Sequence, residues 1–346
     1  MKQLSLLFVL IIIQFDNSFY WSEPVIAQIE VNREETIDFR IANWKNNKKA
    51  ALTLQFDDCT PGQATLGLPA VIKRKLTGTW FINPGKDEYK QYKNYWENMA
   101  PEGGQELANH TMTHTGAKNY QETVYEVGEA SKIIWKIRKQ KENGSLIAFN
   151  RGGGTSWDED DLKKVLNDYH NIDRLANGGV KVDTKTILPG SSSDEIYETV
   201  PKIIESGLWG RLQFHGISAA SGNPPKDYGN GAVYIKEFED FLDKLSMDTS
   251  QLWIAGYIQI YKYLLEKKNS RVEFVIKDKK SISLYVKTSL DQIYFDEPLT
   301  VLANLPTEWK KCKISSKKTV MTVNINKGKA VFDVKPGNDE YLILKL

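Results

Sequence analysis

Two of the four histidines in this chain of 346 residues lie four positions apart, in the stretch "NHTMTH" at residues 109–114. If this segment is helical, both imidazole rings reach one point, so His110 and His114 could bind the same metal ion. The spacing alone is weak support, because two histidines can also lie together near a loop or a helix end. Other polar residues of the chain have to decide between a metal site and this simpler interpretation.

Short apolar runs alternate with amphipathic stretches from about residue 50 to residue 268, and this pattern predicts the elements that position the histidines. We expect strands at 50–56, 77–83, 105–109, 145–150, 171–176, 209–216 and 251–256, with helices in most of the intervals. Strands that alternate with helices indicate βα units and a parallel sheet. Roughly seven such units predict an α/β fold with a (β/α) barrel.

Polar residues follow several of these predicted strands. In a parallel α/β barrel the functional groups lie at the C-terminal ends of the strands. Asp57 and Asp58 follow the first strand, the two histidines follow the strand at 105–109, Arg151 follows a later strand, and His215 lies near the end of another. Each residue alone has an ordinary explanation, such as a helix cap or a turn. Together, two carboxylates, three imidazoles and an arginine would converge on one barrel mouth.

Such a set of groups is typical of metal-assisted hydrolysis. Two histidines and one carboxylate can hold a divalent metal and leave positions open for water and substrate. The metal lowers the pKa of the bound water and polarises a carbonyl, and the reaction still needs a base and an acid. The remaining histidine, His170, lies at a polar helix end and is expected to be a surface residue.

The motifs "FDD", "HTMTH", an arginine followed by glycines, and "FHG" resemble those of the polysaccharide deacetylase family, also called the NodB homology or carbohydrate esterase 4 family. The resemblance covers roughly residues 48–268, and its first two motifs are specific when they occur together. It implies that the barrel is distorted. It further implies a general base at Asp57, metal ligands at Asp58, His110 and His114, an arginine that orients the base at Arg151, and a general acid at His215. The metal would be divalent, most often zinc.

By the same resemblance, the expected substrate is an acetylated polysaccharide or oligosaccharide, with either N-acetyl or O-acetyl groups. Two other functions remain open from the residues. One is hydrolysis of a small amide or imide on the same barrel, and the other is glycan binding without turnover. The net charge of +2 indicates no nucleic-acid partner, and the oligomeric state is left open.

The chain departs from the family pattern at three places. "RGGGTSW" has Gly152–Gly154 where the family usually has a proline and an aromatic residue, so the substrate contacts of this loop are in doubt. "NIDRLANGGVKVDT" lacks the aspartate–tryptophan pair of the fourth family motif, which leaves Asp173 and Asp183 as candidates to orient the acid. Cys59 stands where the family often has glycine. Cys59 and Cys312 are expected to be free thiols.

The first residues are typical of a signal peptide. Lys2 precedes the apolar run Leu4–Ile13, which is too short to span a bilayer. Cleavage after Ala27 and cleavage near Ser18 both remain open. We expect residues 1–27 to be a signal peptide and N-terminal segment. The protein would then be exported to the periplasm, the cell surface or the medium, with no membrane span in the mature protein.

The pattern changes near residue 270. Residues 28–269 are expected to form the barrel, and residues 270–346 contain short β-branched runs that predict a small C-terminal all-β sandwich. This accessory domain contains no histidine, so we expect no catalytic residue there. Trp309, in a polar stretch, is the aromatic residue expected to be exposed, where it could stack on a sugar ring. The favoured alternative is that the domain only packs against the barrel.

Overall fold

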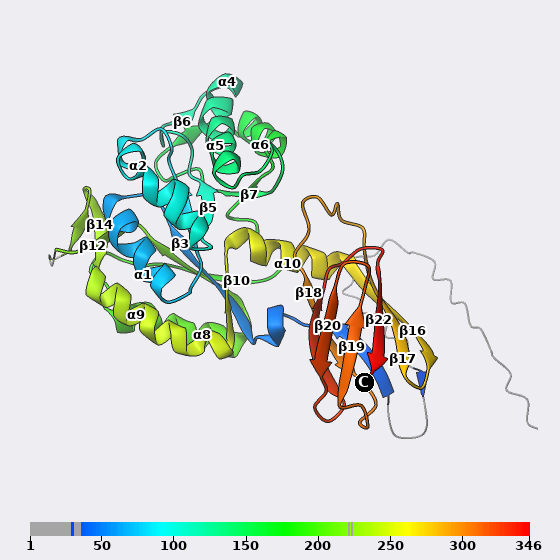
Figure 1. Cartoon of the computed structure of the whole chain (residues 1–346). Helices are drawn as coiled ribbons and strands as arrows, with labels where there is room; N and C mark the ends of the chain where they lie inside the picture. The colour runs from blue at the N-terminus through cyan, green and yellow to red at the C-terminus, as the bar shows by residue number, and fades with distance from the viewer. Residues whose placement is uncertain (1–28, 31–35, 221, 223) are drawn as a thin grey trace, which may run out of the picture.

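The computed structural model describes residues 29–30, 36–220, 222 and 224–346. The predicted signal peptide lies outside these residues and stays a prediction. The described residues form a larger α/β part and a smaller all-β part that lie side by side, with helix α10(Tyr257–Asn269) running from the first toward the second (Figure 1). No helix among the described residues is long and apolar enough to cross a membrane.

A parallel sheet forms the centre of the α/β part. Its strand order is β10-β11-β3-β4-β5-β7-β9, and a further strand, β15, pairs with the first half of β3. The bounds are β3(Ala50–Phe56), β4(Gly78–Ile82), β5(Glu106–Asn109), β7(Ile147–Phe149), β9(Asn171–Asp173), β10(Val182–Thr186), β11(Trp209–Phe214) and β15(Leu252–Ile254). In the described chain β9 and β10 do not pair with each other, so the sheet curves as an open, distorted barrel. This confirms the predicted fold class.

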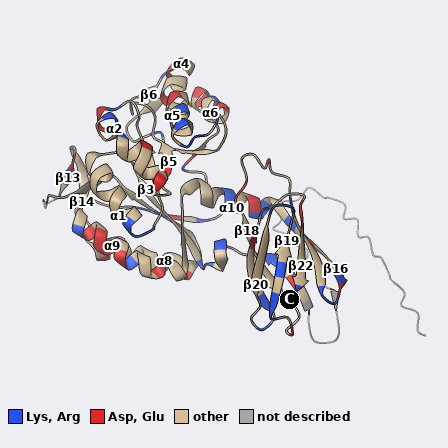
Figure 2. Cartoon of the chain, in the orientation of Figure 1, with Lys and Arg blue, Asp and Glu red and all other residues tan. Residues whose placement is uncertain are grey.

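Helices and short helical turns connect these strands and cover the sheet (Figure 1). The helices are α1(Leu68–Lys73), α2(Asp87–Gln91), α3(Ala100–Glu102), α4(Tyr120–Thr123), α5(Ala130–Ile137), α6(Glu159–Asp168), α7(Ser193–Tyr197), α8(Thr199–Ser206) and α9(Ile235–Met247). π-Helical turns η2(Gln63–Gly67), η3(Tyr95–Met99) and η4(Val124–Glu129) and 3₁₀ turns η1(Lys45–Asn47) and η5(Asp248–Ser250) extend them. Charged residues lie along α8 and α9, whereas β3 carries none, as burial of the central strand requires (Figure 2).

One strand of the sheet, β10, was not predicted from the sequence. β10 reads "VDTKT", a polar stretch without an apolar run, and its side chains are exposed or half-buried. It nevertheless pairs along its whole length with β11. An edge strand is buried on fewer sides than a central strand, so its composition gives a weak signal.

Two antiparallel sheets form the all-β part. One has the order β16-β17-β22-β19-β20 and the other β1-β2-β18-β21. The bounds are β1(Ile29–Glu30), β2(Thr36–Ile41), β16(Ser270–Asp278), β17(Ser281–Thr288), β18(Leu299–Asn304), β19(Lys311–Ser315), β20(Val320–Asn324), β21(Lys329–Val334) and β22(Glu340–Lys345). Smaller pairings join β6(Gly116–Ala117) to β8(Ser156–Trp157), and join β12(Gly216–Ser218), β13(Lys226–Asp227) and β14(Asn230–Tyr234).

Strand β2 differs from the expected division of the chain. The sequence places residues 36–41 with the barrel, but β2 pairs with β18, where Phe39 lies opposite Ala303. Ile37 and Phe39 point inward and are buried, which gives the strand one apolar face. A short alternating strand fits any sheet with a free edge, so the sequence alone could not assign it to the second domain.

Trp309 is buried, with 1% of its surface exposed, so the prediction that it is exposed was wrong. It belongs to a hydrophobic cluster that joins the two parts of the molecule and includes Tyr257 and Tyr263 of α10 together with Leu299 and Phe332 of the all-β part. The tryptophan side chain is therefore unavailable to stack on a sugar. The shared core favours packing against the barrel as the role of this domain.

A chain that ends at Asn269 is expected to aggregate. Removal of residues 270–346 exposes the apolar side of α10 and leaves β2 without its partner β18. Light scattering and gel filtration, with the full chain expressed in parallel as the control, would measure this. A monomeric, folded product would show that the barrel does not depend on the all-β part.

Two buried carboxyl groups lie between α10 and the loop before β18. Glu266 is fully buried and accepts a hydrogen bond from the main-chain N–H of Glu297 at 3.1 Å, while its Oε1 atom has no partner within the described structure. Lys45 forms an ion pair with Glu297 at 2.5 Å. Burial, followed by the charges of Glu297 and Asp296, raises the pKa of Glu266 to about 8.

The protein is therefore expected to lose stability as the pH rises from about 4.5 to about 8. In this window folded Glu266 keeps its proton while the unfolded chain releases it, so the free energy of unfolding falls by up to about 1 kcal/mol per pH unit. Glu266→Gln should flatten this dependence in denaturant titrations at several pH values. The exposed control Glu102→Gln should leave the slope unchanged. An equally steep slope in both variants would contradict the prediction.

Candidate metal centre and catalytic site

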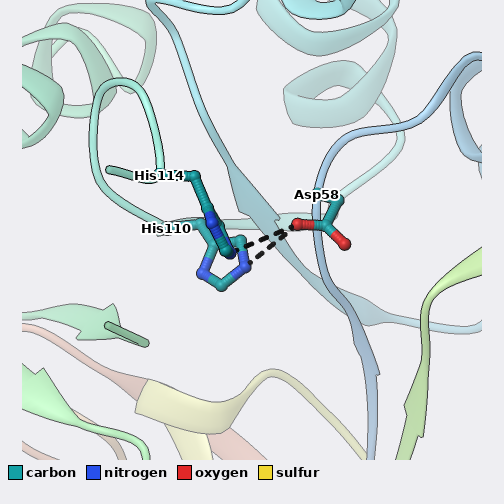
Figure 3. A group of neighbouring side chains, drawn as sticks. All are labelled: Asp58, His110 and His114. Carbon is teal, nitrogen blue, oxygen red and sulfur yellow. Dashed lines mark ion pairs between the residues drawn. The ribbon is translucent and has the colours of Figure 1, made fainter. Parts of the chain in front are cut away.

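Asp58, His110 and His114 form a cluster whose ligand atoms face one another (Figure 3). The Nε2 atoms of His110 and His114 lie 3.4 Å and 3.6 Å from Oδ1 of Asp58. The centroids of the two rings are 4.8 Å apart. Asp58 follows β3 and the histidines follow β5, the two strands that flank β4, so the parallel sheet brings the three side chains to the same edge.

The two histidines meet through a loop, so the condition that the segment is helical is not met. Thr111 and His114 have φ angles of 68° and 63°, in the left-handed region that is unfavourable for residues with a Cβ atom. Hydrogen bonds stabilise this conformation. The N–H of Thr111 donates to Oδ1 of Asn109 at 2.8 Å, and the N–H of His114 donates to Oγ1 of Thr111 at 2.9 Å.

The chemistry of the three groups fits a divalent metal ion. Nδ1 of His110 lies 2.9 Å from the carbonyl oxygen of Asn150, so Nδ1 carries the proton and Nε2 offers its lone pair. Burial, and then the proximity of His110, lower the pKa of His114, which favours the neutral form of this ring that can bind a metal. Burial opposes ionisation of Asp58, but the hydrogen bond with His110 and the charges of His110, His114 and Lys86 together outweigh it and bring the pKa to about 2. Ligand atoms about 2.0–2.2 Å from a tetrahedral zinc ion lie about 3.4 Å apart, close to the observed separations.

Gly152 gives a local reason for the glycines after β7. Its φ angle is 82°, and a Cβ atom at this position would lie 2.4 Å from Nε2 of His114. Any other residue would push the ring away or change the backbone. The departure from the family pattern at this residue therefore makes room for one of the candidate metal ligands.

Asp57 is buried beside the cluster and its two carboxylate oxygens have different surroundings. Oδ2 accepts hydrogen bonds from Arg174 at 2.8 Å, from Gln213 at 2.9 Å and from Asn150 at 3.1 Å. Oδ1 has no hydrogen-bond partner among the described residues. Three donors fix the carboxylate through one oxygen and leave the other free to accept a proton.

One pocket of about 400 Å³ joins these groups. The residues that line it are Asp57, Asp58, Lys86, His110, His114, Gly153, Arg174, Gln213, His215 and Asn230. Five of the six predicted site residues are therefore brought together, and Arg151 does not line the pocket. A pocket of this size holds a small organic group with part of the molecule that carries it.

A comparison of the sequence with protein families finds the polysaccharide deacetylase model in residues 44–169. The resemblance to the polysaccharide deacetylase family is confirmed. The matched region contains both predicted aspartates, the histidine loop and Arg151, and it ends before Arg174 and His215. The matched region includes β3, β4, β5 and β7 of the distorted barrel.

Among curated proteins, the chain is 20% identical over 298 residues to a gellan lyase from a Bacillus species. The similarity covers 79% of this chain but 12% of that protein, so the chain spans about an eighth of the length of this relative.

Solved structures of polysaccharide deacetylase relatives are also similar. A family 4 acetyl xylan esterase from Clostridium thermocellum with a cobalt ion is 12% identical, with a TM-score of 0.40 and 61% and 90% of the two chains covered. A family 4 carbohydrate esterase from Streptomyces lividans with acetate is 16% identical, with a TM-score of 0.39 and coverages of 61% and 93%. A mutant of BA3943, a CE4 family pseudoenzyme, is 15% identical with a TM-score of 0.40 and coverages of 62% and 68%. Identities this low leave the chemistry of this chain to its own residues.

The arginine beside Asp57 is not the one that the polysaccharide deacetylase resemblance implies. Arg151 forms ion pairs with Glu159 at 2.6 Å and with Asp173 at 4.0 Å, and it does not contact Asp57. Arg174 contacts Asp57 instead. Arg151 is drawn outward because a nearby carboxylate at the start of α6 is accessible to its long side chain.

Arg174 follows β9, but the predicted strand continued to residue 176, so the rule that polar residues at strand ends carry function did not select it. Its position is supported from behind by Arg211, which is buried and donates to the carbonyl oxygens of Arg174 at 2.6 Å and Ala176 at 2.8 Å. The guanidinium of Arg211 in turn stacks on the ring of Trp209 at 3.9 Å. These contacts fix the backbone that presents Arg174 to the pocket.

His215 lines the pocket, and its Nε2 atom lies 3.5 Å from Nε2 of Gln213. Neither Asp173 nor Asp183, the two expected candidates, makes a hydrogen bond with His215 in the described chain. Gln63 holds the backbone on both sides of the site, because its Nε2 donates to the carbonyl oxygens of His215 and, at 2.5 Å, of Asp57. The orientation of His215 thus depends on backbone contacts more than on a carboxylate.

The two cysteines are free and buried, as expected. Cys59 adopts a left-handed backbone with a φ angle of 45°, which explains why glycine is often favoured at this position. Burial raises the pKa of the Cys59 thiol to about 12, so it is a protonated packing residue. Its sulfur accepts a hydrogen bond from the N–H of Asn83 at 3.4 Å.

Proposed function

We propose that this chain is a metal-dependent hydrolase that removes acetyl groups from a polysaccharide outside the cytoplasm. The observation that supports it best is the pocket itself, in which a three-ligand cluster, an aspartate with one free oxygen and a histidine share the same space. Metal-assisted transfer of an acetyl group to water uses a metal site, a general base and a general acid. The match to the polysaccharide deacetylase model supports the choice of a carbohydrate substrate.

Asp58, His110 and His114 would hold the metal, with zinc as the candidate. A divalent ion bound there lowers the pKa of a water molecule and polarises a carbonyl group. In the proposed reaction, Oδ1 of Asp57 takes a proton from water while the water oxygen bonds to the acetyl carbon. His215 gives a proton to the leaving nitrogen or oxygen as its bond to that carbon breaks, and acetate is released. A main-chain N–H near Gly153 is the candidate donor to the developing oxyanion.

The test is acetate release from a panel of N-acetylated and O-acetylated glycans. The protein would be assayed as purified, after treatment with a chelator and after addition of zinc. Release that stops on chelation and returns with zinc supports the proposal. Activity on cyclic imides with none on glycans would favour a small-molecule amide hydrolase. Glycan binding without acetate release at any metal loading would favour a binding protein.

Export is the second part of this proposal and depends on residues 1–27. N-terminal sequencing of the mature protein from culture medium and cell fractions would test it. A protein that keeps Met1 and stays in the cytoplasmic fraction would contradict it.

Arg174→Gln is expected to lower kcat/KM for acetate release by about 10-fold to 100-fold. The variant loses a charge-assisted hydrogen bond to Asp57, an interaction typically worth about 1.5–3 kcal/mol. Arg151→Gln is the matched control and should change kcat/KM by less than about 3-fold, since Arg151 makes only partly exposed ion pairs. A larger loss in the Arg151 variant would restore the family assignment.

A further inference from the structure

Lys86 is a pocket residue that the proposed mechanism does not use. It is half-buried and lines the same pocket as Asp58 and His114. Among the described residues, its ammonium group has no ion-pair or hydrogen-bond partner. It precedes α2 directly, whereas Lys90, one turn further on, is exposed and forms an ion pair with Asp87 at 3.0 Å. The unpaired cation therefore faces the reaction space and the paired one faces solvent.

The backbone fixes Lys86 against the histidine loop. The N–H of Gly85 donates to the carbonyl oxygen of Met112 at 2.9 Å, and the N–H of Lys86 donates to the carbonyl oxygen of Asn83 at 3.1 Å. The Asn83 amide donates to the carbonyl oxygens of His110 and, at 3.1 Å, of Thr111. A Cβ atom on Gly85 would lie 2.8 Å from the Met112 oxygen, so the two segments are in close contact. Lys86 thus has a defined place beside the candidate metal.

The positive charge of Lys86 is not balanced by a negative charge in the pocket. Asp57 is paired with Arg174 at 2.8 Å, and Asp58 would share its charge with a divalent ion. One carboxylate against a divalent cation leaves one positive charge, and Lys86 adds a second. A half-buried ammonium group that faces a cationic centre is stabilised when an anion lies between the two positive charges.

We propose that Lys86 determines specificity by binding an anionic group of the substrate, so that the substrate is an acetylated acidic polysaccharide with a carboxylate on the acetylated sugar or its neighbour. Lys86 and the candidate metal ligands line one pocket of about 400 Å³, so the carboxylate of the substrate must lie close to its acetyl group. The inference rests on the proposed deacetylase function and narrows its substrate class. An ammonium group on a flexible stem attracts a carboxylate as a point charge without strict geometry.

The test compares substrates that differ only in charge. An O-acetylated oligogalacturonate and an oligosaccharide of N-acetylmuramic acid would each be used as the free carboxylate and as the neutral methyl ester. The zinc-loaded wild type should have a lower KM for each carboxylate that it deacetylates than for its ester. Lys86→Met should raise KM for the carboxylate by about 10-fold, which corresponds to about 1.4 kcal/mol, with kcat within about 2-fold. KM for the ester should not change.

Lys86→Arg should have a KM for the carboxylate close to that of the wild type, because arginine keeps the positive charge. Lys90→Met should behave as the wild type. Equal changes in KM for carboxylate and ester would overturn the proposal, as would no change for either. A loss of bound metal in Lys86→Met would also overturn it, by showing that the residue supports the histidine loop. If the wild type deacetylates only the esters, the inference fails and the proposed function stands. If it releases acetate from none of these substrates or the wider glycan panel, the proposed function fails and the inference falls with it.

Discussion

Asp57→Asn is expected to reduce the rate of acetate release by about 10²-fold to 10⁴-fold, the usual contribution of a general base, while the protein keeps its metal. The three donors to Oδ2 can hold the amide oxygen of asparagine in the same place. The amide nitrogen would then occupy the position of Oδ1, where it cannot accept a proton from water. The variant keeps the shape of the pocket but lacks the general base.

Asp58→Asn is the matched control at the neighbouring position. It should weaken metal binding itself, because Oδ1 of Asp58 lies beside both histidine nitrogens. Metal content by mass spectrometry and single-turnover rates at saturating zinc would separate the two effects. Equal loss of metal in both variants would contradict the division of roles between the two aspartates.

His114→Ala is expected to remove most of the bound metal. Two remaining ligands are too few for a stable site, so the affinity should fall by more than the roughly 10-fold to 100-fold that follows loss of an outer-shell partner. The overall fold should survive, because His114 lies in a surface loop and is partly exposed. Equilibrium dialysis with zinc would measure the affinity, and circular dichroism would check the fold.

His170→Ala provides the control for this variant. His170 lies outside the pocket, and its ring contacts the hydroxyl group of Tyr294 at 3.1 Å. It should keep the metal, although its contact with the all-β part can lower stability slightly. If His114→Ala still binds zinc in a 1:1 ratio with unchanged affinity, the assignment of His114 as a ligand is wrong.

The sequence was sufficient to predict the residues that follow the buried strands. β3, β4 and β7 are short apolar runs that are buried throughout, and polar residues at the ends of the parallel strands share one edge of the sheet. Asp57, Asp58, His110 and His114 could therefore be grouped before the structure was known, and the family resemblance implied that Asp58 is the carboxylate ligand. The chemistry of two imidazoles and a carboxylate then indicated a metal.

The tertiary structure decided which polar residues meet. Arg151 and Arg174 both follow strands, and the sequence could not show that one forms an ion pair with Glu159 while the other reaches Asp57. Long side chains can point in several directions from the same backbone position, so their contacts depend on neighbours that are distant in sequence. The spacing of the histidines could not show that a loop, with left-handed backbone angles at Thr111 and His114, brings the two rings together.

The sequence determined the fold class, the change of pattern near residue 270 and the kind of chemistry, because burial periodicity and side-chain type are local properties of the chain. Only the tertiary structure showed that β2 belongs to the all-β part, that Trp309 is buried in a shared core and that Lys86 lies unpaired beside the metal ligands. Each of these depends on contacts between segments separated by many residues. Such contacts depend on packing and charge in the folded molecule, and the sequence of one segment does not identify the segment that it contacts.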